Sequence, residues 1–167
     1  MHSIAETPRL IIRQFHPEEE EAYLELFSDQ LVKEHLPVRT DEEHRKIFRD
    51  TINEDADGAV FSKWAVIHKT DGDLIGMGLL RIYNGEPDKL ETGYALHVKY
   101  WGQGIATELT HALIAYAMGY PEITTIVAVT TPTNIASQIV LEKAGLIKQG
   151  NIVRNNEELS FYKMDLA

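Results

Sequence analysis

The chain has 167 residues, which fits one domain of ordinary size and predicts a single domain over residues 1–167. Asp and Glu outnumber Lys and Arg by 26 to 16, so the formal net charge is −10. Nucleic acid is therefore not expected as a partner, because phosphate contacts need clustered Lys and Arg. An acidic surface favours cationic partners, including amines and basic peptides, although it also serves simple solubility.

The composition excludes several kinds of site. There is no cysteine, hence no disulfide scaffold, no thiolate zinc site and no cysteine nucleophile. The 7 histidines show no paired metal spacing, so no metal site is expected. No apolar stretch is long enough for a membrane span, and the first ten residues lack the order of a secretion signal. A cytoplasmic location without a membrane partner is expected.

The N-terminal part predicts one strand followed by two helices. Residues 9–15 alternate in the manner of a strand, and Pro17 suits the first turn of the helix that follows. Asp41 is typical of an N-cap for a second helix that ends near Asn53.

Three strands are predicted next, over residues 61–69, 74–83 and 90–98. Asp71-Gly72 lies between the first two of them and is typical of a type I′ hairpin turn.

The period then changes to that of a helix. The predicted elements are a helix over residues 103–118, a strand over 123–130, a helix over 134–144 and strands over 146–153 and 159–164. The whole order is β-α-α-β-β-β-α-β-α-β-β. It predicts an α/β (α+β) fold in which four helices flank a mixed sheet of about seven strands.

The segment from Gly102 to Thr107 (GQGIAT) lies between a predicted strand and a predicted helix. The start of a helix exposes unpaired N–H groups and the positive end of the helix dipole, and both attract phosphate. Gly102 and Gly104 let the backbone approach an anion without an intervening Cβ. The segment is therefore predicted to be a diphosphate-binding turn.

Two common nucleotide-binding turns do not fit this segment. A P-loop needs Gly-Lys-Ser/Thr, which does not follow here. A Rossmann turn needs Gly or Ala where this chain has Thr107, and an acidic residue at the end of the next strand, which instead ends Ala-Val-Thr-Thr.

The run ETGYALHVKYWGQGIATEL, followed after the next strand by NIASQIVLEKAGL, resembles the GNAT N-acetyltransferases. The chain is most similar to their RimJ/RimL-like branch, the ribosomal-protein N-terminal acetyltransferases. The opening TPRLIIRQF and the helix order agree with that branch, so the resemblance covers almost the entire chain. It implies an acetyl-CoA-dependent enzyme that transfers acetyl directly to a primary amine, either a protein N-terminus or a small molecule.

The resemblance also implies which residues hold acetyl-CoA. The diphosphate would bind the backbone amides of Gln103, Gly104, Ile105, Ala106 and Thr107. The pantetheine arm would pair with the backbone of Leu96, His97 and Val98, as an added strand does, in a splay before the next strand. Asn134 would lie near the pantetheine. The family's usual Arg or Gln at the head of the turn is Trp101 in this chain.

Candidate catalytic residues are Ser137 and Glu91. Many similar enzymes use a Tyr as the acid, but this chain has Leu141 at that position, and Ser137 is the substitute that the branch suggests. Glu91 is the candidate base, because a carboxylate on a strand with small and apolar neighbours would have a raised pKa. A structural ion pair is the alternative for Glu91, and His97 is an alternative base.

Other readings stay open. Leu141 favours a catalytically silent, CoA-binding regulatory domain, and the acyl donor could be longer than acetyl. The resemblance allows a homodimer. It also implies that the N-terminal part, with Arg9, Arg13, Glu34 and His35, shapes the acceptor pocket.

Overall fold

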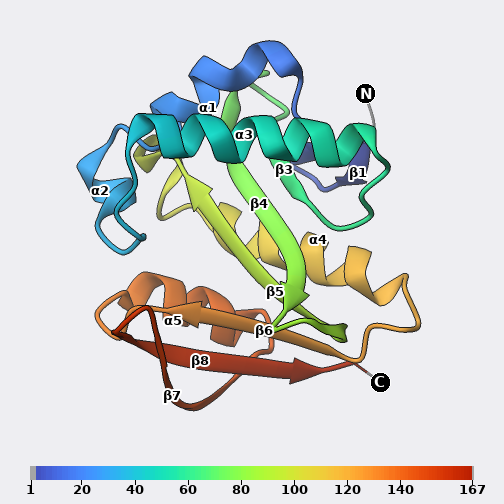
Figure 1. Ribbon diagram of the computed structural model, residues 1–167, viewed down its shortest axis with the longest axis vertical. Helices are drawn as coiled ribbons and strands as arrows, with labels where there is room; N and C mark the ends of the chain where they lie inside the picture. The colour runs from blue at the N-terminus through green and yellow to red at the C-terminus, as the bar shows by residue number, and fades with distance from the viewer. Residues whose placement is uncertain (1–2, 167) are drawn as a thin grey trace.

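Eight strands form one mixed sheet in the computed structural model, which describes residues 3–166. The strand order across the sheet is β1-β2-β3-β4-β5-β6-β8-β7 (Figure 1). The strands are β1 (Ser3–Glu6), β2 (Leu10–Arg13), β3 (Lys63–His68), β4 (Leu74–Tyr83), β5 (Glu86–Leu96), β6 (Thr125–Thr130), β7 (Ile147–Arg154) and β8 (Glu157–Asp165). The helices are α1 (Glu20–Leu26), α2 (Gln30–Lys33), α3 (Asp41–Ala56), α4 (Ile105–Met118) and α5 (Ile135–Lys143), with short 3-10 turns η1 (Pro17–Glu19) and η2 (Val98–Tyr100).

The predicted fold class is confirmed, with two additions. The short edge strand β1 raises the strand count to eight, and it pairs antiparallel with β2. The single-turn helix α2 follows Asp29, whose side chain accepts a hydrogen bond from the N–H of Leu31. Both elements have four residues, too few for hydrophobic periodicity to reveal them.

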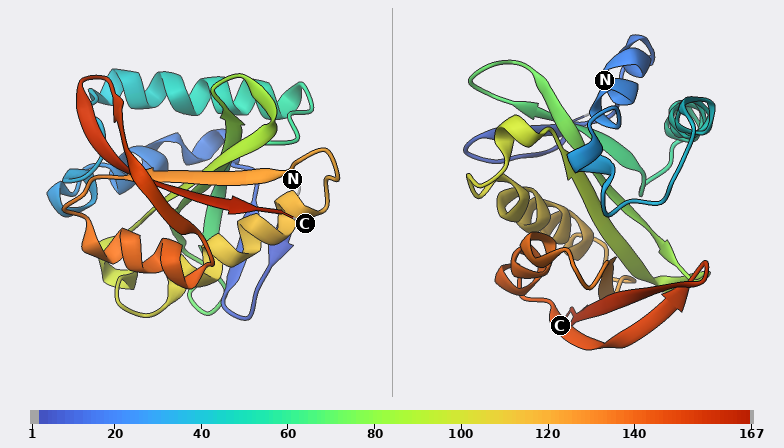
Figure 2. Two further views of the ribbon diagram at one scale, coloured as in Figure 1. Left: turned by 90° about the horizontal axis from the view of Figure 1, so that it is seen from below. Right: turned by 90° about the vertical axis from the view of Figure 1, so that its left-hand side faces the viewer.

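Helices cover both faces of the sheet. Figure 2 shows α1 and α3 on one face and α4 and α5 on the other. The first face packs an aromatic cluster in which the Phe15 ring meets Tyr23 and Phe48 at centroid distances of 5.6 and 5.4 Å. On the second face, Leu109 and Leu113 of α4 are fully buried in the larger core cluster. The site described below lies on this second face.

Two of the hairpin turns contain two consecutive residues in the left-handed conformation. Asn84-Gly85 joins β4 to β5 with φ of 50° and 71°, and Asn155-Asn156 joins β7 to β8 with φ of 52° and 62°. Positive φ at both central residues is what a type I′ turn requires. At Asp71-Gly72 only the glycine has a positive φ, so the type I′ prediction for that loop was wrong.

Gly76 of β4 lies tightly against β5. A Cβ at this position would lie 2.2 Å from the carbonyl oxygen of Ala95, which is backbone and cannot rotate away. We expect Gly76→Ala to lower the free energy of unfolding by roughly 2–3 kcal/mol, as overpacking does. Gly150→Ala on β7 is the control, because nothing lies within 4 Å of its added Cβ. Urea denaturation of both variants tests this, and equal midpoints would contradict it.

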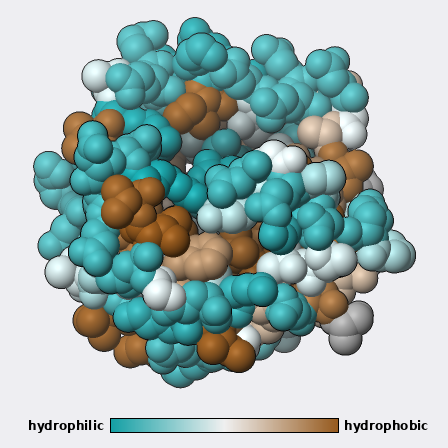
Figure 3. All heavy atoms as spheres, turned by 60° about the horizontal axis from the view of Figure 1, so that its bottom comes forward, coloured by the Kyte–Doolittle hydropathy of each residue, from teal (hydrophilic) through white to brown (hydrophobic). Residues whose placement is uncertain are grey.

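None of the described helices is long and apolar enough to cross a membrane. On the face shown in Figure 3, hydrophilic side chains predominate and the hydrophobic ones form separate patches.

Candidate active site

The turn before α4 presents a row of backbone N–H groups. Gly102 and Gly104 have φ of 71° and 78°, and Gly104 is the N-cap of α4. The first helical hydrogen bond runs from Glu108 N to Gly104 O, so the preceding amides have no helical partner. Within residues 3–166, the N–H groups of residues 103–107 donate to no protein group. This geometry fits the predicted binding of a diphosphate.

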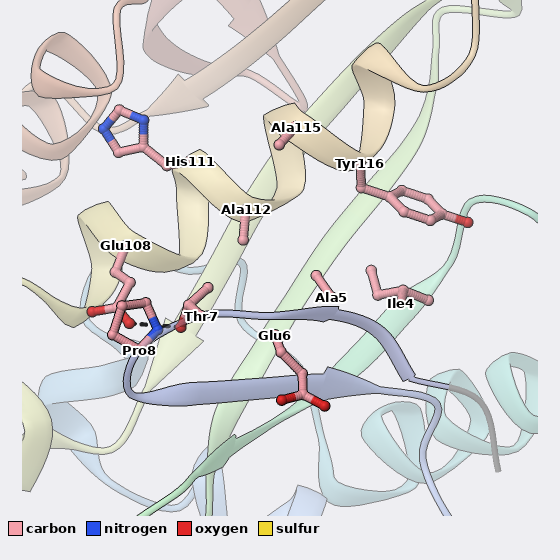
Figure 4. Close-up of a pocket in the computed structure, with 10 residues that line it drawn as sticks. All are labelled: Ile4, Ala5, Glu6, Thr7, Pro8, Glu108, His111, Ala112, Ala115 and Tyr116. Carbon is pink, nitrogen blue, oxygen red and sulfur yellow. Dashed lines mark hydrogen bonds between the residues drawn. The ribbon is translucent and has the colours of Figure 1, made fainter.

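Arg9, just before β2, contacts this turn from 94 residues away in the sequence. Its Nη1 donates to the carbonyl of Gln103 at 2.7 Å, and its Nε donates to Glu108 at 2.7 Å. The other Glu108 oxygen accepts from the backbone N–H of Arg9 and from the Thr7 hydroxyl, at 2.9 and 2.6 Å. Figure 4 shows Thr7 and Glu108 facing each other at one end of a groove between β1 and α4.

That groove has a volume of about 630 Å³ and is lined mainly by small and apolar side chains of the two elements. His111 lies at its edge and is exposed. The groove is on the β1 side of α4, whereas the gap described next opens between β5 and β6.

The parallel strands β5 and β6 separate part-way along their length. They pair from Lys89–Thr125 to Glu91–Val127, although β5 continues to Leu96 and β6 to Thr130. The N–H of His97 donates to Ile75 of β4 at 2.8 Å, so by alternation the backbones of Tyr94 and Leu96 face the gap. The structure thus has the splay that the resemblance implied.

The three residues expected to pair with a pantetheine arm differ in what they offer. Both backbone groups of His97 are used within the protein, since its carbonyl also accepts from Tyr100 N at 2.9 Å. The Leu96 carbonyl accepts from Trp101 Nε1 at 2.8 Å, which ties the head of the turn to the end of β5. The N–H of Leu96 faces the gap, and that of Val98 has no backbone acceptor among residues 3–166. Leu96 and Val98 therefore remain candidate donors, whereas the N–H of His97 does not.

Two hydroxyl groups approach each other on the α5 side of β5. Asn134 is the N-cap of α5, and its side-chain oxygen accepts from Ser137 N at 3.1 Å. Burial raises the pKa of Tyr94, and the nearby Ser137 hydroxyl opposes part of that rise. The ordinary pKa of a tyrosine, 10, already lies above neutral pH and burial raises it further, so the Tyr94 phenol is protonated near neutral pH and can donate a hydrogen bond or a proton. Leu141 is buried in the core one turn further along α5.

Glu91 is held in an ion cluster. Both of its oxygens accept from Arg154, at 3.1 and 2.9 Å, and one also accepts from Arg81 at 3.0 Å. Burial alone would raise the pKa of Glu91, but the bonds from Arg154 and the charges of both arginines bring it below its ordinary value. The expectation of a raised pKa was therefore wrong, and a structural ion pair is what the contacts show.

The residues of the N-terminal part do not share one pocket. Arg13 pairs with Glu19 at 2.7 Å, and Arg9 lies at the turn before α4. The His35 Nδ1 and the Thr131 hydroxyl lie 2.7 Å apart, just beyond the carboxyl end of β6. Glu34 lies beside it, 3.8 Å from the other ring nitrogen.

Tyr94 was not singled out from the sequence, and Arg9 was expected at the acceptor pocket rather than at the turn before α4. The alternation Leu90, Thr92, Tyr94, Leu96 places Tyr94 on the face opposite Glu91, but nothing marks that face as the one toward α5. Arg9 carries no local signal for the turn. Its role depends on how β2 approaches α4, which no spacing in the sequence reveals.

Comparisons with known proteins agree with this geometry. A family model described as "Acetyltransferase (GNAT) domain" matches residues 9–147. The uncharacterized N-acetyltransferase YnaD of Bacillus subtilis is 30% identical over 146 residues, which cover 86% of this chain and 82% of YnaD. A GNAT-family acetyltransferase from Bacillus anthracis has a crystal structure that matches with a TM-score of 0.81 at 28% identity, over 96% of both chains.

A more distant structure has the same fold. RimL, a ribosomal alpha-N-protein acetyltransferase in complex with coenzyme A, matches with a TM-score of 0.83 at 18% identity, over 99% of this chain and 98% of RimL. Since the family match spans most of the chain, this protein belongs to the GNAT family and is an N-acetyltransferase.

Proposed function

We propose that this chain transfers an acetyl group from acetyl-CoA directly to a primary amine of a peptide or a small molecule. The observation that carries the proposal is the divergence of β5 and β6 beyond Glu91–Val127, beside the unpaired amides of residues 103–107. The diphosphate would lie on those amides, and the pantetheine would follow the open backbone of β5, with Asn134 beside it. The absence of cysteine agrees with transfer in a single step.

The protein groups at the end of the gap suit this reaction. As the amine nitrogen attacks the thioester carbon, the carbonyl oxygen gains charge that the N–H of Leu96 or Val98 can stabilise. The C–S bond then breaks, and Ser137 or Tyr94 donates to the departing thiolate. Glu91 is engaged by two arginines, so we assign the amine proton to water rather than to Glu91.

The test is amine-dependent release of CoA thiol from acetyl-CoA, followed with a thiol-reactive chromophore. The cysteine-free chain contributes no background to this assay. The amine panel contains peptides with free N-termini, amino acids, polyamines and aminoglycosides, and mass spectrometry identifies the acetylated product. We expect thiol release with at least one class. CoA binding by calorimetry without thiol release over the whole panel would instead support a catalytically silent CoA-binding domain.

The donor is tested in the same assay. Acetyl-CoA is compared with butyryl-CoA and longer acyl-CoA thioesters at equal concentration. Preference for a longer donor would overturn the acetyl assignment while leaving acyl transfer intact.

A further inference from the structure

The diphosphate turn has no positive charge of its own. The segment YWGQGIAT from Tyr100 to Thr107 contains neither Lys nor Arg, and the first charged residue after it is the acidic Glu108. A diphosphate on this turn would meet a carboxylate in the first turn of α4, in a chain whose net charge is −10. Dipoles of backbone amides favour an anion, but a cation close by adds a stronger, charge-assisted interaction.

The structure places the guanidinium of Arg9 beside this turn. The Arg9 guanidinium uses Nε for Glu108 and Nη1 for the Gln103 carbonyl. Within residues 3–166, its third nitrogen, Nη2, donates to no protein group. Nη2 lies 3.5 Å from the position that a Cβ on Gly104 would occupy, so it borders the same turn as the free amides. The side chain is 40% exposed, whereas that of Glu108 is 17% exposed.

We propose that Arg9 is the cationic binding residue for the CoA diphosphate, holding the Gln103 carbonyl in place and offering Nη2 to a phosphate oxygen. This inference rests on the proposed use of acetyl-CoA. Arg9 also neutralises Glu108, which would otherwise repel the diphosphate. The Thr7 hydroxyl and the Arg9 backbone hold the second Glu108 oxygen, so the carboxylate acts as the anchor that aims the guanidinium.

An arginine suits this position better than a lysine would. The guanidinium is planar and carries donors in several fixed directions, so it can meet a carboxylate, a carbonyl and a phosphate together. The ammonium of a lysine sits on a flexible stem and would lack this fixed arrangement of donors. A cation brought from another segment also accounts for a turn headed by Trp101 rather than by the family's usual Arg or Gln.

The experiment compares CoA with pantetheine, which has the same thiol arm but lacks the diphosphate and the adenosine 3′-phosphate joined to it. Dephospho-CoA, which keeps the diphosphate and lacks the 3′-phosphate, should respond to the Arg9 variants as CoA does. All three ligands are titrated into the full chain and its Arg9→Gln and Arg9→Lys variants, with intrinsic tryptophan fluorescence, to which Trp101 beside the turn contributes, as the readout. The matched control is Arg13→Gln, which removes one positive charge from an ion-paired arginine of β2 that contacts Glu19 instead.

We expect Arg9→Gln to raise the Kd of CoA roughly tenfold to a hundredfold, the effect of a charge-assisted hydrogen bond. Arg9→Lys should fall between this variant and the parent. Pantetheine should bind the parent and Arg9→Gln within about twofold of each other, and Arg13→Gln should change neither ligand. Equal weakening of CoA and pantetheine would show a merely structural role and overturn the inference. So would unchanged CoA binding in Arg9→Gln, whereas a parent chain that does not bind CoA would overturn the proposed function as well.

Discussion

Ser137→Ala and Tyr94→Phe are each expected to lower kcat for acetyl transfer by roughly tenfold to a thousandfold, with little change in KM for acetyl-CoA. Ser137 comes from α5 and Tyr94 from β5, the two elements beside the point where β5 and β6 separate. Ser137 is close enough to Tyr94 to influence its pKa, and the Tyr94 phenol, whose ordinary pKa of 10 is raised further by burial, is protonated near neutral pH. Both can therefore donate to the thiolate, whose charge appears only as the C–S bond breaks.

Steady-state kinetics with a saturating amine measure this effect. Ser28→Ala and Tyr83→Phe are matched controls, because they delete the same groups in the turn after α1 and at the end of β4. If the two hydroxyls act as one relay, the double variant should lose little more than the worse single variant. Unchanged kcat in both single variants, with CoA binding intact, would contradict a role for either group in the departure of the thiolate.

Glu91→Gln is expected to lower the free energy of unfolding by about 2–3 kcal/mol at neutral pH. Loss of one partner in a buried ion pair typically costs about 3–5 kcal/mol, and the partial exposure of Arg81 and Arg154 reduces that figure. The Glu91 side chain is 8% exposed, whereas those of Arg81 and Arg154 are 51% and 30% exposed. The variant leaves two partly buried cations without their carboxylate.

The contribution of Glu91 to the free energy of unfolding depends on pH with a definite sign. Since folding lowers the pKa of Glu91, its contribution is fully present above the ordinary value of 4.5 and is lost as pH falls through the lower, folded-state pKa. Urea denaturation from pH 7 down to pH 3 should therefore show a smaller loss of stability for Glu91→Gln than for the parent. Glu20→Gln is a suitable control, because Glu20 also pairs with two arginines, Arg45 and Arg49, but on the surface of α1. We expect a much smaller change in stability for that control.

The same Glu91→Gln variant distinguishes a structural role of the carboxylate from a catalytic one. At a pH and temperature where it is fully folded, we expect kcat/KM to stay within about threefold of the parent, because two arginines engage the carboxylate and lower its pKa, which makes it a weak base. General-base removal would instead lower the rate by roughly a hundredfold or more. A loss of that size in folded protein would restore Glu91 as the base.

Local patterns in the sequence were enough to predict most of the fold. Apolar periodicity located α4 and β6, and the Gly-rich turn before α4 was predicted from the N–H groups and dipole of a helix start. These features depend on neighbours in sequence. The short elements β1 and α2 were missed because four residues are too few for a periodic apolar pattern to be recognised, and their stability comes from pairing and packing with other segments.

The chemistry of the site depended on contacts between distant segments. Glu91 looked like a base with a raised pKa until the fold brought Arg154, which is 63 residues away, onto its carboxylate. Arg9 looked like part of an acceptor pocket, yet β2 delivers it to a turn 94 residues away. Ser137 of α5 comes near Tyr94 of β5 only in the folded chain. The pKa and the role of an ionisable side chain depend on its burial and on the charges around it, and in this protein tertiary packing decides both.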